Sequence, residues 1–163
     1  MSGAERSKEA EMASEQGKHE LQALLSALRA IRMSHHTAHW QVKGTPFYAD
    51  HLMFQRLYEA VDDEIDTLGE KIVAKYGVDA VDAVESCDRM CRLLEQVKGD
   101  DLYERAVKLE RVLQHLLEGT LKALADGKCL TPGLENFLQG IADSHETAVY
   151  LLGQRTAGDS AGE

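Results

Sequence analysis

Apolar residues recur at helical spacing along most of the chain, and the pattern separates into long segments joined by short polar breaks. The first segment covers about residues 17–41, and its apolar positions form one stripe: Leu21, Leu24, Leu25, Leu28 and Ile31. The second covers about residues 47–76 and is followed by Gly77, a residue type that commonly caps the C-terminal end of a helix. Both segments are long and periodic enough to predict amphipathic α-helices.

The second half of the chain continues this organisation. Residues 78–97 are more weakly amphipathic and predict one short helix. A third long helix is expected from about residue 99 to residue 127. A fourth begins at Thr131-Pro132, where a capping residue precedes a proline at the first helical position, and runs through Leu152.

The composition and the order of the helices indicate an all-α protein. A chain of 163 residues is one domain by length, and its hydrophobic content of 44% supplies a core. Four long helices with a short helix in a long middle crossover predict a ferritin-like four-helix bundle. We expect this domain over residues 17–153, with flexible tails at residues 1–16 and 154–163, where apolar periodicity is lacking.

Charge and hydropathy narrow the class of protein. The formal net charge of -10 argues against a surface for nucleic acid or anionic membrane. No apolar run is long enough to span a bilayer, and the first twenty residues contain no apolar region of a signal peptide, so a cytoplasmic protein is expected. Cys87, Cys91 and Cys129 have no second Cys or His pair to complete a zinc site, and they are expected to be reduced, partly buried thiols.

Two histidines and two carboxylates carry the candidate chemistry, because imidazole and carboxylate together suit divalent iron. His39 and His51 flank a Gly-Thr-Pro break, so a tight turn between the first two helices brings them together. Asp66 and Glu70 lie on the second helix, and Asp66 follows His51 by fifteen positions, roughly 22 Å along a helix. One metal ion cannot be bound by both pairs of the same chain. Either the pairs are unrelated, or the carboxylates of one subunit face the histidines of another in a symmetric, antiparallel contact.

The segment from His39 to Gly77 resembles the Dps-like branch of the ferritin superfamily. The shared pattern consists of these elements: His39-Trp40, the turn Gln41-Val42-Lys43-Gly44, His51, Leu57-Tyr58, Asp66-x-x-x-Glu70 and Gly77. The motif covers about a quarter of the chain, and the helical organisation extends the resemblance to nearly all of it. The resemblance implies a di-iron ferroxidase centre between two subunits, with the histidines from one and the acidic pair from the other, the arrangement that the distance between the pairs also favours.

The same resemblance implies a biological role and an assembly. The protein is expected to be a hollow homododecamer that oxidises Fe(II), preferably with hydrogen peroxide rather than O2, and stores the ferric product, so that it protects against oxidative stress. Its net negative charge is expected to attract cations towards the pores of this assembly. The candidate pore residues are Glu135, Asp126 and Asp143.

Several neighbouring residues are weaker candidates. Gln55 stands where the family usually has an acidic residue one turn after the second histidine, which predicts a weaker or water-bridged second iron position. Trp40 resembles an aromatic that intercepts oxidising radicals in the family, although core packing explains it equally well. His35 either extends the site or supports its ligands, and Asp62 and Glu59 line the site or face solvent. The remaining histidines have no ligand-like partner at a suitable spacing: His19, His36, His115 and His145.

Three alternative functions fit the sequence less well. A di-iron site inside the bundle needs Glu-x-x-His motifs, and the corresponding Asp143-x-x-Glu146 lacks the histidine. A DNA-compacting structural protein, the main alternative, needs basic tails, whereas both tails here are net acidic, so DNA binding is not expected. A helical scaffold without metal chemistry leaves the histidines and carboxylates unexplained.

Overall fold

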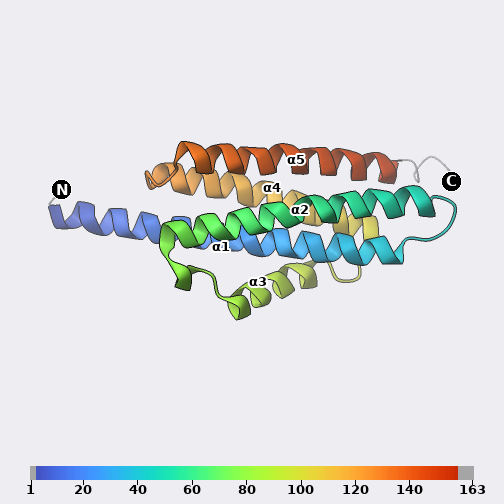
Figure 1. Cartoon of the computed structure of the whole chain (residues 1–163), viewed down its shortest axis with the longest axis horizontal. Helices are drawn as coiled ribbons and strands as arrows, with labels where there is room; N and C mark the ends of the chain where they lie inside the picture. Colours follow the sequence, from blue (N-terminus) through green and yellow to red (C-terminus); the bar gives the residue numbers. More distant parts are fainter. Residues whose placement is uncertain (1–2, 158–163) are drawn as a thin grey trace.

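The computed structural model describes residues 3–157, which form five α-helices and one short 3-10 helix and contain no strand (Figure 1). In chain order the elements are α1 (Gly3–Gln41), α2 (Phe47–Tyr76), η1 (Val78–Ala80), α3 (Ala83–Gln96), α4 (Leu102–Asp126) and α5 (Pro132–Ala157). The prediction of an all-α protein is therefore confirmed. None of the described helices is long and apolar enough to cross a membrane.

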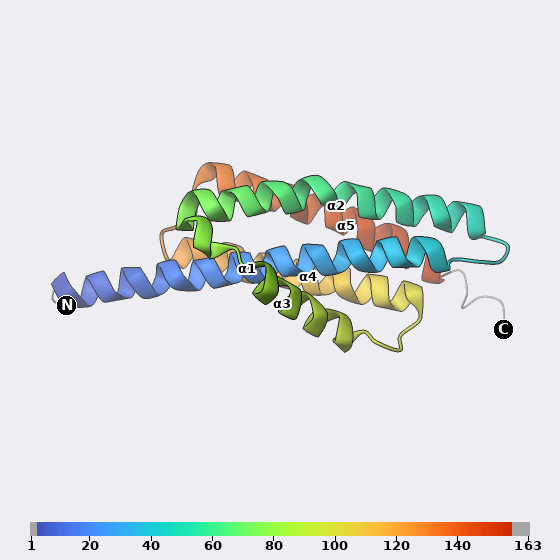
Figure 2. The same cartoon turned by 60° about the horizontal axis from the view of Figure 1, so that its bottom comes forward.

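Four of these helices lie side by side as a bundle, and α3 lies outside it. The views in Figures 1 and 2 show α1, α2, α4 and α5 running along a common axis, with α3 against the outer side of α1. The long connection between α2 and α4 carries α3, and this is the ferritin-like arrangement that the sequence predicted. The N-terminal part of α1 extends beyond the end of the bundle (Figure 1).

Local capping sets the ends of the helices. Gly77 has a φ of 91°, which glycine adopts without strain, and its N–H donates to the carbonyl of Val73 at 2.9 Å. Asp82 and Asp101 accept backbone N–H groups from the first turns of α3 and α4. The hydroxyl of Thr131 accepts from the N–H of Leu134 at 3.3 Å, so the predicted cap of the last helix is confirmed.

The ends of the chain are more helical than expected. The first helix begins earlier than the predicted start near residue 17, because residues 3–16 form the first turns of α1, and α5 continues to Ala157. Residues 4–13 are mostly Ala, Glu, Lys, Arg and Met, which have high helix propensity. Apolar periodicity reports burial rather than helix formation, so it does not detect a helix that extends past its bundle. Residues 1–2 and 158–163, which belong to the predicted tails, lie outside the described part.

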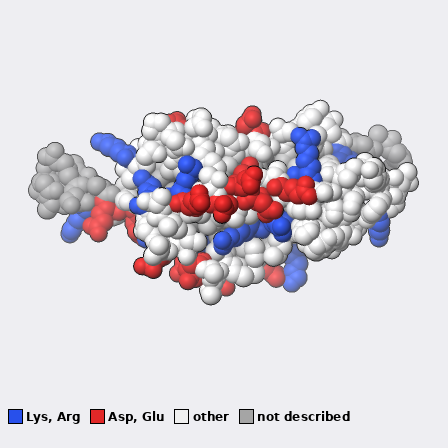
Figure 3. Space-filling model, in the orientation of Figure 1, with Lys and Arg blue, Asp and Glu red and all other residues white. Residues whose placement is uncertain are grey.

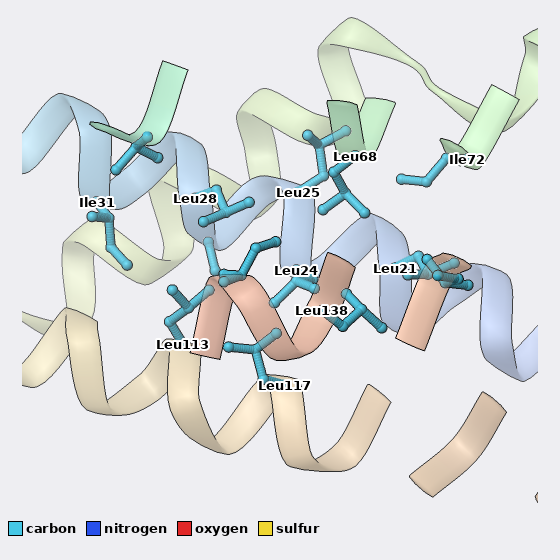
Figure 4. Close-up of a cluster of buried hydrophobic side chains, with 14 of the residues drawn as sticks. Leu21, Leu24, Leu25, Leu28, Ile31, Leu68, Ile72, Leu113, Leu117 and Leu138 are labelled. Atoms are coloured by element: carbon cyan, nitrogen blue, oxygen red, sulfur yellow. The ribbon is translucent and has the colours of Figure 1, made fainter. Parts of the chain in front are cut away.

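The main core fills the middle of the bundle. The apolar stripe predicted for the first helix is buried against side chains from α2, α4 and α5 (Figure 4). The fully buried members with the largest side chains include Leu21, Leu24, Leu28, Ile31, Leu68, Ile72, Leu113, Leu117 and Leu138. Burial of each such side chain contributes about 1.5–3 kcal/mol, so this cluster fixes which faces of the helices meet.

A smaller core lies where α1 turns into α2. Val42 is buried here with Phe54 and Leu57 of α2, and its N–H donates to the carbonyl of Ala38 at 3.0 Å. Gly44 takes a φ of 83°, which allows the chain to reverse within a few residues. The turn holds the end of α1 against the start of α2, and this placement builds the candidate site.

Candidate metal centre

His39 and His51 lie directly against each other at the turn between α1 and α2. Their rings stack with centroids 3.6 Å apart. The Nδ1 atom of His39 is 2.9 Å from the carbonyl oxygen of His51, and the Nδ1 atom of His51 is 2.9 Å from the carbonyl oxygen of His39. The prediction that the turn brings the two histidines together is confirmed.

These reciprocal hydrogen bonds fix the tautomer of both rings in their neutral form. A carbonyl oxygen can only accept, so each Nδ1 carries the proton and donates it. In the neutral imidazole the other nitrogen, Nε2, then keeps its lone pair. A backbone carbonyl that holds Nδ1–H is the usual support for a histidine that ligates a metal through its other nitrogen. The turn therefore presents two oriented nitrogen donors side by side.

Buried Asp50 anchors the start of α2 next to His51. Its carboxylate accepts hydrogen bonds from the Tyr103 hydroxyl of α4 and from the Arg155 Nε of α5, the latter at 3.1 Å. Burial, followed by the bond to this carboxylate, raises the pKa of Tyr103 to about 12. Two other helices, α4 and α5, thus hold the residue that precedes His51, and this restricts the position of the imidazole.

Aromatic side chains surround the pair of histidines on the outer surface. Phe47 stacks on His51 with ring centroids 5.1 Å apart, and Tyr58 meets His39 edge-on at 5.5 Å. Trp40 is 66% exposed and packs on His36, with centroids 4.2 Å apart. The explanation of Trp40 as a core residue is therefore wrong for the single chain.

Asp66 and Glu70 are exposed on α2, away from the histidines of their own chain. α2 is one unbroken helix between His51 and Asp66, so the separation of roughly 22 Å expected from helix geometry applies. Figure 3 shows acidic side chains gathered across the middle of the face over which α2 runs. In residues 3–157 no group of three or more His, Cys, Asp or Glu side chains is arranged to hold a metal ion. In the single chain the two histidines and the two carboxylates lie apart as separate pairs, and their assignment as metal ligands stays a prediction.

Three polar neighbours on α2 have partners of their own. Gln55 donates its amide N–H to the carboxylate of Glu59 at 2.9 Å. Asp62 pairs with Arg32 of α1 at 2.9 Å. Asp62 therefore lies at the solvent-exposed surface, where it forms an ion pair with Arg32.

A second group of ionisable side chains is buried inside the bundle, and it was not predicted from the sequence. Each of the four bundle helices contributes one residue: His35, Glu64, Glu110 and His145. Glu110 accepts from His35 Nε2 at 2.7 Å and from His145 Nδ1 at 2.5 Å, and His145 Nε2 bonds Glu64 at 2.9 Å. We call these four residues the interior network. His35 is fully buried and does not extend the surface site. His145 has no ligand-like partner at a suitable spacing in the sequence, but it finds hydrogen-bond partners on two other helices.

The carboxylates keep His145 protonated. Burial alone would lower the pKa of His145, but the hydrogen bonds and negative charges of Glu110 and Glu64 outweigh it and raise the pKa to about 9. Burial likewise favours neutral Glu110, yet the hydrogen bonds from His145 and His35 hold its pKa below the usual value. The interior network is therefore an imidazolium between two carboxylates.

The interior network predicts how stability depends on pH. The pKa of His145 is raised in the folded state, so its contribution is complete below about pH 6.5 and is lost as the pH rises through about 9; the shift corresponds to about 3 kcal/mol. The pKa of Glu110 is lowered, so its contribution is present above about pH 4.5 and is lost as the pH falls further. Urea denaturation from pH 3 to pH 10 should show the largest free energy of unfolding between these limits. His145→Gln should flatten the alkaline loss, and an unchanged alkaline loss in this variant would contradict the assignment.

Comparison with solved structures places the fold. Dps from Thermosynechococcus elongatus superposes with a TM-score of 0.79 at 15% identity, covering 90% of this chain and 94% of that one. Dps from Vibrio cholerae O1, described as a member of a broad superfamily of ferritin-like diiron-carboxylate proteins, gives 0.74 at 18% identity, covering 89% and 91%. Dps from Microbacterium arborescens in its high iron form gives 0.69 at 15% identity, covering 89% and 95%. At the level of sequence, no family model and no curated protein matches the chain. The chain therefore has the ferritin-like fold of the Dps proteins, as the resemblance of its central motif predicted.

Proposed function

We propose that this chain is the subunit of a Dps-like mini-ferritin, which oxidises Fe(II) with hydrogen peroxide and stores the ferric product inside a closed dodecamer. The observation that carries the proposal is the division of the ligand set. The turn between α1 and α2 presents two histidines with free Nε2 atoms, and exposed Asp66 and Glu70 lie further along α2. A second copy in antiparallel contact completes both half-sites at once.

The surface around the histidines supports a contact with a second copy. Four large apolar side chains near the turn are markedly exposed: Trp40 at 66%, Phe47 at 44%, Tyr48 at 72% and Leu52 at 44%. An exposed apolar patch of this kind, bordered by polar residues, is typical of a protein interface. Acidic side chains lie further along α2, so an antiparallel partner places its carboxylates opposite this patch.

At the completed centre the side chains have distinct roles. The Nε2 atoms of His39 and His51 bind the substrate iron from one subunit, and Asp66 and Glu70 bind it from the other. The two carboxylates attract the ferric product more strongly than the ferrous substrate because its charge is higher, and this favours oxidation. Two iron ions together supply the two electrons that one peroxide takes, so no hydroxyl radical needs to leave the site.

Gln55 is expected to lower the affinity of one of the two iron positions in the proposed centre. Its amide carries no charge and is hydrogen-bonded to Glu59, so it binds a second iron ion more weakly than a carboxylate would. We therefore expect one iron position to bind tightly and the other weakly. The exposed acidic residues Asp126, Glu135 and Asp143 stay candidates for lining a pore, and Asp126 is paired with Lys122 at 2.5 Å.

DNA compaction is the weaker alternative. Phosphate binding needs clustered Lys and Arg, whereas the chain carries 28 acidic residues against 18 basic ones. We expect the protein to act on iron without strong DNA binding.

Iron oxidation and particle size test the proposal together. Fe(II) should be oxidised much faster after addition of peroxide than in air, and the iron should elute with the protein in one large particle on size-exclusion chromatography. The physical reason is that the centre exists only where two subunits meet. Two results would contradict the proposal: a monomer that oxidises Fe(II) at the full rate, or a large particle whose presence does not make Fe(II) oxidation faster than in buffer alone.

A further inference from the structure

Two cysteines lie together on the exposed side of α3. Cys87 and Cys91 are four residues apart, and both thiols are exposed, so the expectation of partly buried thiols is wrong for this pair. Residues four apart on a helix share one face. The third cysteine, Cys129, is half-buried, and its Sγ donates to the carbonyl of Gly127 at 3.2 Å. The chain therefore holds one exposed dithiol and one isolated thiol.

The two exposed thiols can reach one ion together. Cys87 and Cys91 lie one turn apart on α3, so their Cβ atoms are about 5–6 Å apart on the same face of the helix. This spacing matches the bite of a single metal ion, since two thiolates about 2.3 Å from one ion lie about 4 Å apart.

A thioether lies beside this dithiol. Met33 of α1 and Cys91 of α3 line the same cavity of about 410 Å³, which also contacts Thr37 and Leu94. Met33 is 47% exposed, so its flexible side chain can move towards the thiols. Two thiols and a thioether are all soft donors.

We propose that Cys87 and Cys91, with Met33 as the third donor, form a binding site for a soft monovalent cation, Cu(I). Thiolate and thioether sulfur select Cu(I) over the harder divalent ions that prefer nitrogen and oxygen. On binding, one Cu(I) reacts with two thiols to give a copper dithiolate, and two protons are released. The site shares no residue with the candidate iron centre, so it stands or fails separately from the proposed function.

Metal binding suits the helix better than a disulfide does. A disulfide needs its Cβ atoms about 3.5–4.5 Å apart, whereas Cβ atoms four residues apart on a helix are about 5–6 Å apart. Closing that bond would distort α3, which is anchored to α1 through a 2.6 Å hydrogen bond from Arg29 to Ser86. A bridging ion spans the two sulfur atoms without moving the backbone.

Anaerobic titration of the assembled protein with Cu(I), in competition with a coloured Cu(I) chelator, tests the site. We expect one Cu(I) per chain, ultraviolet charge-transfer absorption from thiolate to metal, and about two protons released per ion, because a Cu(I) dithiolate forms. Cys87→Ser and Cys91→Ser should each weaken binding more than about tenfold, and Met33→Leu should weaken it less. Cys129→Ser and Met53→Leu, which remove sulfur outside α3, should bind like the wild type.

Other outcomes overturn the proposal. Unchanged Cu(I) affinity in the folded Cys87→Ser and Cys91→Ser variants would place the metal elsewhere. Displacement of Cu(I) by an equal concentration of Zn(II) would show that the site is not selective for a soft cation. Failure of a small thiol reagent to label Cys87 and Cys91 in the assembled protein would show that assembly covers the dithiol.

Discussion

Glu110→Ala is expected to lower the free energy of unfolding by about 3–5 kcal/mol, because it removes one partner of a buried ion pair. Glu110 is fully buried and accepts hydrogen bonds from both His35 and His145. Its loss leaves a protonated imidazole in the core with Glu64 as its remaining partner, and leaves the Nε2–H of His35 without an acceptor. Urea denaturation followed by circular dichroism at pH 7 measures the change.

A matched substitution on the same helix controls for the loss of a glutamate. Glu118 of α4 is exposed, and Glu118→Ala should change the free energy of unfolding by no more than about 0.5 kcal/mol. A Glu110→Ala protein within about 1 kcal/mol of the wild type would mean that the interior network contributes little to stability.

Removing a proposed iron ligand is expected to slow peroxide-driven Fe(II) oxidation by at least about tenfold without dissolving the particle. The four variants are His39→Ala, His51→Ala, Asp66→Ala and Glu70→Ala. Each deletes one donor of the centre, while the core that holds the helices stays intact. Initial rates from stopped-flow absorbance, together with size-exclusion chromatography, separate the loss of a ligand from a loss of assembly.

Two exposed residues serve as controls for these variants. Asp63 lies on α2 near Asp66, and His115 is an exposed histidine of α4. Asp63→Ala and His115→Ala should keep the wild-type rate, because neither belongs to the proposed ligand set. Equal slowing by Asp63→Ala and Asp66→Ala would indicate a general effect of surface charge and would contradict a specific role for Asp66.

The sequence predicted the features that depend on a single helix, such as its bounds, its cap and its buried face. The bounds of α2 at Phe47–Tyr76, the cap at Gly77 and the apolar stripe of α1 follow from local propensity and periodicity. The close approach of His39 and His51 followed from the short turn. The direction of their ring nitrogens did not, because it depends on carbonyl positions that only the folded turn defines.

The interior network could not be predicted in this way because its members come from four helices. His145 occupies a position on the buried stripe of α5, between Ile141 and Ala148, and this was an available signal that a polar side chain enters the core. Its partners, Glu110 and Glu64, are distant in sequence, so spacing within one helix says nothing about them. A histidine on an apolar stripe calls for a buried partner even when the partner cannot be named.

The proposal that two subunits share one centre is tested most directly by mixing two slowed variants. His51→Ala and Asp66→Ala subunits are unfolded together, reassembled and assayed for peroxide-driven Fe(II) oxidation, with each variant reassembled alone as the control. In a mixed dimer one centre carries both defects and the other is intact, so random mixing should restore about a quarter of the wild-type rate. If the histidines and carboxylates of one chain formed the centre, every centre would remain defective, and the mixture would be no more active than either variant alone.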